Sequence, residues 1–229
     1  MSMFSTATAA CPSCGTVRTF KLVASVNADR RPDLRAAILD GSFQRETCAK
    51  CGTEFVAPPT LTYLHVKNGQ YILVQPLKFQ EAWEASEKMA RDAFERAYGA
   101  GAGTAAQEIG SGLALRIVFG WAALREKLRC DELRVTDVDL ELLKLALVRN
   151  ADESPLGDTT ELRLIGGDAK TLQLAWISAP TERVLSGFEV PRATYDEIAK
   201  DRSIWEAARA DMAAYPFVDI NRMLLLPAA

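Results

Sequence analysis

Two copies of a C-x-x-C-G motif place the strongest constraint on how this chain can fold. They read CPSCG at residues 11–15 and CAKCG at residues 48–52. Each tight turn can aim two sulfur atoms at one point, and a tetrahedral zinc site needs four such donors about 2.3 Å from the ion. The glycine that ends each motif can adopt positive φ, which lets the chain turn back and point amide groups at the thiolates.

A single C-x-x-C motif is also compatible with redox chemistry, but two motifs with the same trailing glycine favour one shared metal ion. We therefore predict that Cys11, Cys14, Cys48 and Cys51 bind one structural Zn²⁺ per chain. A catalytic zinc has three protein ligands and an open position, whereas four cysteines close the coordination sphere. The predicted role of the metal is to stabilise the fold of the N-terminal module.

The overall composition is that of an ordinary globular protein. The chain has 229 residues, of which 48% are apolar and 25% charged, and its net charge is −3. No apolar run reaches the roughly 18 residues that span a bilayer, and residues 1–10 lack the features of a signal peptide. We expect no membrane association and a cytoplasmic location, because thiols arranged for metal binding are typical of a reducing compartment.

Residues 1–78 are predicted to form a mostly β module pinned by the metal. After a loose lead-in at residues 1–10, alternation and β-branched content indicate strands at 18–26, 42–47, 54–57, 61–66 and 71–75. A short helix at 33–41 interrupts these strands, and Asp33 can cap its start. The Asn68-Gly69 pair predicts a hairpin turn between the last two strands.

Residues 79–229 form the second predicted domain, which is mainly helical. Helices are expected at 79–98, 107–129 and 137–149, and from near 191 to 212. The aromatic stripe of the first helix indicates core packing. Residues 99–103 (GAGAG) lack the context of a phosphate-binding loop and are interpreted as a hinge. Thr136 can cap the third helix, while Thr194 and Glu197 form a capping-box pattern.

A β-hairpin is predicted near residues 161–177, and residues 217–226 are apolar enough to dock on the protein. The predicted fold class is therefore α/β in the α+β sense. An N-terminal zinc-ribbon-like β module with a helical insertion is followed by a mainly helical domain with a hairpin.

Several further segments are similar to one bacterial protein family. They include Pro32-Asp33-Leu34, ILDG at 38–41, the strand at 61–63, FGW at 119–121, LREKL at 124–128 and LLK at 142–144. Together with the two cysteine motifs, they make the chain resemble the CpXC proteins. The second motif carries Ala49 where the family has proline, which only stiffens the turn. The resemblance implies a zinc-ribbon-like module and carries no biochemical activity with it.

The chain is predicted not to be an enzyme. Its single histidine, His65, is expected to be a structural residue on a strand, and there is no G-x-S-x-G motif. Asp137, Asp139 and Glu141 lie at the start of a predicted helix, where their expected role is dipole compensation and solvent contact. Cys130, a fifth cysteine, is expected to pack in the core.

Two non-enzymatic functions are compatible with this pattern. We favour a protein-interaction or scaffold module, with a protein partner or self-association. The alternative is a nucleic-acid-binding ribbon, because residues 1–80 hold nine Lys and Arg against five Asp and Glu. The basic side chains available to contact phosphates are Arg18, Lys21, Arg30, Arg31, Arg35, Arg45 and Lys50. This small excess without a basic run is weak support for nucleic-acid binding.

Overall fold

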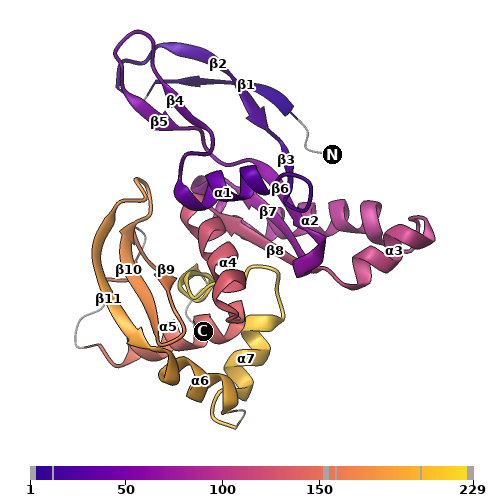
Figure 1. Ribbon diagram of the computed structural model, residues 1–229, viewed down its shortest axis with the longest axis vertical. Coiled ribbons are helices and arrows are strands. Elements are labelled where there is room, and N and C mark those ends of the chain that lie inside the picture. The colour runs from indigo at the N-terminus through magenta and orange to yellow at the C-terminus, as the bar shows by residue number, and fades with distance from the viewer. Residues whose placement is uncertain (1–3, 12, 152–154, 158, 202, 226–229) are drawn as a thin grey trace. The chain divides into compact units, whose positions relative to one another are not determined.

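The computed structural model describes residues 4–11, 13–151, 155–157, 159–201 and 203–225 (Figure 1). The chain forms two compact units: unit 1 comprises residues 1–76 and 88–121, and unit 2 comprises residues 77–87 and 122–229. Both units mix helices and strands, which confirms the predicted fold class. The predicted domain boundary at residue 78 stays a prediction.

Two antiparallel hairpins of unit 1 carry the cysteine motifs. Strands β1 (Phe4–Ala10) and β2 (Val17–Val23) pair over their whole length around the first motif. Strands β4 (Arg45–Thr47) and β5 (Glu54–Val56) pair around the second. The prediction of a loose lead-in at residues 1–10 was wrong for the described part of that segment. Alternating Thr and Ala side chains gave no apolar signal, yet backbone pairing with β2 makes the segment a strand.

The centre of unit 1 is a four-stranded mixed sheet in the order β3-β6-β7-β8. Its strands are β3 (Ser25–Asn27), β6 (Leu61–His65), β7 (Gln70–Gln75) and β8 (Ala114–Phe119). Helix α1 (Pro32–Asp40) follows β3 and ends at Gly41, which has φ 77°. The short 3-10 turn η1 (Val66–Asn68) and Gly69 join β6 to β7, at the predicted hairpin position.

The predicted helix at residues 107–129 was wrong, because this segment forms a helix, a strand and a second helix. Helix α3 (Thr104–Ser111) ends before β8, which lies parallel to β7, and α4 (Trp121–Leu133) follows. The apolar run that indicated a buried helix is instead a buried strand. Ile117, Val118 and Phe119 are almost fully buried there. A short apolar run does not distinguish the two structures by periodicity.

Helix α2 (Trp83–Tyr98) begins four residues later than predicted. Phe79 lies before it in the 3-10 turn η2 (Leu77–Phe79) and is exposed. The rest of the predicted aromatic stripe packs as expected. In unit 1, the ring centroid of Tyr71 lies 5.2 Å from that of Phe94 and 5.9 Å from that of Tyr98.

Unit 2 contains a three-stranded antiparallel sheet in the order β11-β10-β9 (Figure 1). Strands β9 (Thr160–Gly167) and β10 (Thr171–Ser178) form the predicted hairpin. Strand β11 (Val184–Pro191) extends the sheet and was not predicted. Most of its residues are exposed, so its sequence lacks the alternation that marks a half-buried strand.

The helices of unit 2 pack around a large apolar core shared with this sheet and a smaller apolar cluster beside the C-terminal segment. They are α4, α5 (Asp137–Arg149), α6 (Arg192–Lys200), α7 (Glu206–Ala213) and α8 (Asn221–Leu225). The core joins Leu residues of α5 to Leu residues of β9 and β10, with Tyr195 and Ile198 of α6. Thr136 caps α5 as predicted, since its hydroxyl accepts a hydrogen bond from the Asp139 amide at 3.1 Å.

The predicted single helix from 191 to 212 is broken into α6 and α7. The predicted capping box was also wrong, because Pro191 is the N-cap of α6 and makes no side-chain cap. Thr194 therefore lies inside the helix. Docking of the C-terminal segment is confirmed for its described residues: Phe217, Val218 and Ile220 are each at most 3% exposed. Residues 226–229 lie outside the described part of the chain.

Candidate metal centre

The four cysteines of the two motifs converge on one point in unit 1. Their sulfur atoms all lie within 4.8 Å of one another. The Cys11 and Cys51 sulfurs are 3.7 Å apart, and so are those of Cys14 and Cys48. Each close pair therefore joins one motif to the other. Cys11 and Cys48 are buried, Cys14 is half-buried and Cys51 is exposed.

The two motifs build the same local structure, which we call a knuckle: residues 11–16 in the first and 48–53 in the second. In the first knuckle, the Cys11 amide donates to the Thr16 carbonyl at 3.0 Å and the Gly15 amide to the Cys11 carbonyl at 3.0 Å. In the second, the equivalent distances are 2.9 Å and 2.7 Å. Gly15 and Gly52 have φ values of 68° and 73°. Glycine adopts this left-handed conformation without steric penalty, as the sequence predicted.

Hydrogen-bond donors around the sulfur atoms of the second knuckle favour the thiolate form. The amides of Cys51 and Lys50 lower the pKa of the Cys48 thiol. The hydroxyl and amide of Thr53 lower the pKa of Cys51 to about 6. Metal ligation by cysteine requires the thiolate, so these donors prepare the site for a cation.

The geometry of the four sulfur atoms fits a tetrahedral ion. Ligands at about 2.3 Å from a tetrahedral zinc are separated from one another by about 3.8 Å. The two measured sulfur separations of 3.7 Å agree with that spacing. No sequence-predicted ligand lies away from the cluster. The four cysteines can therefore hold one metal ion, and all four coordination positions would be filled by protein.

His65 and Cys130, which the sequence analysis also considered as candidate functional residues, lie outside the metal centre. His65 ends β6, and its Nε2 lies 3.8 Å from the Asp29 carboxylate, while its ring packs edge-on at 6.5 Å from Tyr63. Cys130 is 4% exposed within the core of unit 2, where burial raises its pKa well above the ordinary value. Core packing of Cys130 is thus confirmed.

The basic side chains of unit 1 are partly neutralised by nearby groups. Arg31 pairs with Asp33 at 2.6 Å, and Arg45 lies 3.8 Å from Glu54 and donates to the Gly41 carbonyl. Arg30 and Lys50 are exposed, whereas Arg35 is half-buried. The side chains of Arg18 and Lys21 lie outside the described part of the chain.

A second cluster of charged side chains, in unit 2, was missed by the sequence analysis. Glu126, Glu141 and Asp219 place carboxylate oxygens within 4.8 Å of one another, and all three are buried. The predicted solvent contact of Glu141 was wrong, because that side chain is fully buried. A signal was present: Leu140, Leu142 and Leu143 surround Glu141 on α5, and a helix that is apolar all round is buried.

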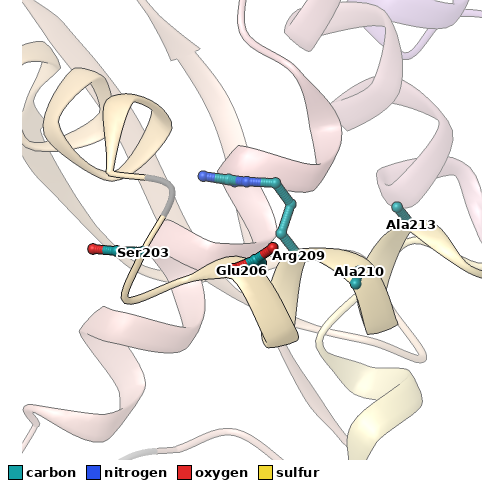
Figure 2. Close-up of a pocket in the computed structure, with 5 residues that line it drawn as sticks. All are labelled: Ser203, Glu206, Arg209, Ala210 and Ala213. Atoms are coloured by element: carbon teal, nitrogen blue, oxygen red, sulfur yellow. The ribbon is translucent and has the colours of Figure 1, made fainter.

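A shallow groove runs along α7 on the surface of unit 2. It has a volume of about 530 Å³ and is lined by Ser203, Glu206, Arg209, Ala210 and Ala213. Figure 2 shows Ser203 at one end of the groove and Ala213 at the other. The Arg209 guanidinium is engaged by the Asp139 carboxylate and the Ile198 carbonyl. The groove therefore presents mainly alanine and aliphatic surface and holds no cluster of reactive groups.

The fold and the four-cysteine site define an α+β protein built on two ribbon-like cysteine knuckles that can hold a metal ion. The chain belongs to the CpXC protein family, whose pattern matches residues 9–144. The match contains all four cysteines and ends inside α5, before the sheet of unit 2. No curated protein and no solved structure matches the chain. Among the described residues, no helix is both long and apolar enough to cross a membrane.

Proposed function

We propose that this protein is a non-catalytic interaction or scaffold module whose knuckles are held by one structural Zn²⁺. The observation that carries the proposal is the convergence of four cysteine sulfurs with the spacing of a tetrahedral site. Four thiolates leave no open position for a substrate or a water molecule. Their combined negative charge also weakens the metal as a Lewis acid. The metal then serves to join the two hairpins of unit 1.

Zinc is the metal that we propose because thiolate ligands in a tetrahedron suit it, and because the site needs no redox change to do its work. Thiolates of this kind persist in a reducing compartment, which supports the proposed cytoplasmic location. A role without catalysis is supported by the place of His65, which pairs with Asp29 beside β6 and lies outside the metal centre.

A protein partner, or a second copy of the chain, is favoured over nucleic acid. Arg31 is paired with Asp33, and Arg45 lies 3.8 Å from Glu54, which reduces the free positive charge of these two side chains. Several large apolar side chains of unit 2 are exposed instead, among them Val184, Leu185 and Ile204 at 56%, 59% and 76%. These side chains give a partner protein apolar surface to bury.

Metal analysis of the purified protein tests the zinc site. We expect about one zinc per chain, and we expect Cys48→Ser to lose the metal and to unfold residues 11–57 locally. Cys130→Ser is the matched control, because it removes a buried cysteine outside the site and should keep the full metal content. Iron in place of zinc, or a metal-free protein with folded knuckles, would contradict the proposal.

Light scattering and affinity capture test the interaction role with the same two variants. A defined complex or a self-association should form with wild type and Cys130→Ser and weaken in Cys48→Ser. Binding to a mixed oligonucleotide is measured in parallel, since phosphate contacts weaken steeply with added salt. A strictly monomeric protein that shows salt-sensitive oligonucleotide binding, reduced by Arg30→Glu, would favour the nucleic-acid function instead.

A further inference from the structure

The buried charge cluster of unit 2 joins four separate parts of the chain. Lys144 of α5 donates from its Nζ to Glu126 of α4 at 2.7 Å and to Glu141 at 2.8 Å. Arg163 of β9 binds Glu126 at 3.1 Å and Asp219 at 2.5 Å. Each of these five side chains is at most 4% exposed.

Backbone amides complete the cluster. The Leu164 amide donates to Glu126 at 2.6 Å, and the Ile220 amide donates to Glu141 at 2.9 Å. The Asn221 amide donates to Asp219 at 2.9 Å. The Ile220 amide and the Asp219 carboxylate belong to the segment of residues 217–222, so the cluster fastens that segment to Glu141 of α5 and Arg163 of β9.

The cluster contains more acids than bases. Glu126, Glu141, Glu161 and Asp219 supply four carboxylates, whereas Lys144 and Arg163 supply two cations. The remaining nearby pair, Lys127 and Asp137, is neutral as a whole, with 3.2 Å between its charged atoms. Full ionisation would therefore bury two excess negative charges. Burial of unpaired charge is costly, and neighbouring carboxylates in such a site do not all ionise together.

We propose that the cluster holds one exchangeable proton on Glu141, shared with Glu126 and Asp219, and that loss of this proton loosens the segment 217–222. Glu141 is the candidate because it has only one cationic partner, Lys144, whereas Glu126 has two. The protonated carboxyl keeps an oxygen that accepts from the Ile220 amide, and its hydroxyl can donate to a neighbouring carboxylate.

The pKa shifts of the buried carboxyl groups support the assignment of the proton to Glu141. Burial raises the pKa of Glu141 to about 7, against the opposing effects of Lys144 and Lys127 and with help from Asp219 and Glu126. Burial also acts to raise the pKa of Glu126 and of Asp219, but Lys144 and Arg163 outweigh it, and both pKa values lie below their ordinary range. Burial raises the pKa of Glu161. The groups of one cluster thus divide into permanent anions and proton acceptors.

The segment of residues 217–222 is the part of unit 2 that can loosen when Glu141 loses its proton. Helix α5 and strand β9 are anchored by Leu140, Leu143, Leu162 and Leu164 in the large core of unit 2. The segment rests on a smaller apolar cluster of Met212, Val218 and Ile220. When Glu141 ionises, repulsion acts on Asp219, which sits on the segment. The segment 217–222 should therefore unfold locally before α5 and β9 do, because local unfolding starts where the least apolar contact is lost.

Carboxyl-carbon NMR of the full-length protein, from about pH 5 to about pH 9, tests the proposal directly. Glu141 should titrate near neutral pH. Hydrogen exchange of the Ile220 amide, corrected for its intrinsic pH dependence, should lose protection by up to about tenfold per pH unit as the pH rises from about 5 to the Glu141 midpoint, and should level off above it.

The variant Glu141→Gln should make Ile220 protection independent of pH, while Glu197→Gln should keep the wild-type profile. Should Glu141→Gln fail to fold, the two wild-type titrations decide alone. A Glu141 that titrates in the acid range, or protection of Ile220 that stays constant from about pH 5 up to the Glu141 midpoint, would overturn the proposal. So would excess Mg²⁺ that removes the titration, because the carboxylates would then form a cation site.

Discussion

At the scale of single residues, burial decides what a charged side chain does in this protein. Glu141 sits near the start of α5, a position where an exposed acid would compensate the helix dipole. It is instead fully buried beside Lys144, three residues along the same helix. Helical spacing of this kind usually indicates a solvated surface pair. In this protein, both side chains of the pair lie in the interior of unit 2.

Replacing the buried cation Lys144 tests how strongly the buried charges of unit 2 stabilise one another. Lys144→Met leaves Glu126 and Glu141 without their shared partner, so we expect unit 2 to lose about 3–5 kcal/mol of stability. Adding Glu141→Gln should recover part of that loss, because one uncompensated charge disappears. Urea unfolding measures both changes, with Lys200→Met on the exposed end of α6 as the control. Equal stability of Lys144→Met and the control would contradict the buried network.

Glycine in the second knuckle offers a test of backbone conformation alone. A Cβ added to Gly52 would meet no atom within 4 Å, so Gly52→Ala should act only through its φ of 73°. The left-handed conformation costs an L-residue about 1–2 kcal/mol. Chelator competition should therefore show roughly tenfold weaker metal retention. Gly101→Ala, which also meets no atom within 4 Å and has no positive φ, should retain the metal as wild type does.

At the scale of elements, the knuckles and helix α5 follow local rules, whereas strands in apolar runs and the predicted caps at Asp33 and Thr194 do not. Helix α5 begins after Thr136 as predicted, because its cap is a contact between near neighbours in sequence. Strand β8 was mistaken for part of a helix, because its identity depends on pairing with β7, more than forty residues earlier. Strand β11 was missed for a related reason, since only β10 makes it a strand.

The β6–β7 turn lies close to the α3–β8 connection. This contact allows a test of whether residues 107–129 are divided into a helix, a strand and a second helix. A Cβ on Gly69 would lie 2.7 Å from the Gly112 carbonyl oxygen, and Gly69 has φ 64°. We expect Gly69→Ala to destabilise unit 1 by about 2 kcal/mol or more, from strain and from the clash together. Gly103→Ala, where a Cβ meets nothing within 4 Å, is the control for denaturant unfolding. Were residues 107–129 one helix, this contact would not form and Gly69→Ala would cost only the strain of its positive φ.

At the scale of the whole molecule, the two units are stabilised in two different ways. Unit 1 places its four cysteines where a metal can join two small hairpins. Unit 2 has a large leucine-rich core and adds a buried charge cluster to it. We therefore expect the two units to respond differently to solution conditions, with metal removal affecting unit 1 and pH affecting unit 2.

The stability of unit 2 should fall between about pH 5 and about pH 8. The pKa of Glu141 is about 7 in the folded chain, above its ordinary 4.5, so its stabilising effect is complete below the unfolded value. That contribution, on the order of 3 kcal/mol, is lost as the pH rises through the folded value. The pKa values of Glu126 and Asp219 are lowered, so their contribution is lost as the pH falls through their folded values.

Thermal unfolding across the pH range measures this dependence, followed by signals from the core of unit 2. Wild type should be most stable near pH 5, and Glu141→Gln should show a clearly shallower profile from about pH 5 to about pH 8, with Glu161 contributing what slope remains. The exposed substitution Glu197→Gln is the control and should leave the slope unchanged. A wild-type protein whose stability rises over this interval would contradict the assignment of Glu141.

The sequence alone determined the site, the fold class and the family resemblance. The four cysteines and their glycines were sufficient, because each knuckle is closed by bonds within six residues of chain. Tertiary structure alone decided that residues 114–119 form a strand, that β11 completes a sheet, and that Glu141 lies in the interior. These outcomes depend on partners distant in sequence, and burial by distant elements sets both the pairing of a strand and the ionisation of a carboxyl group.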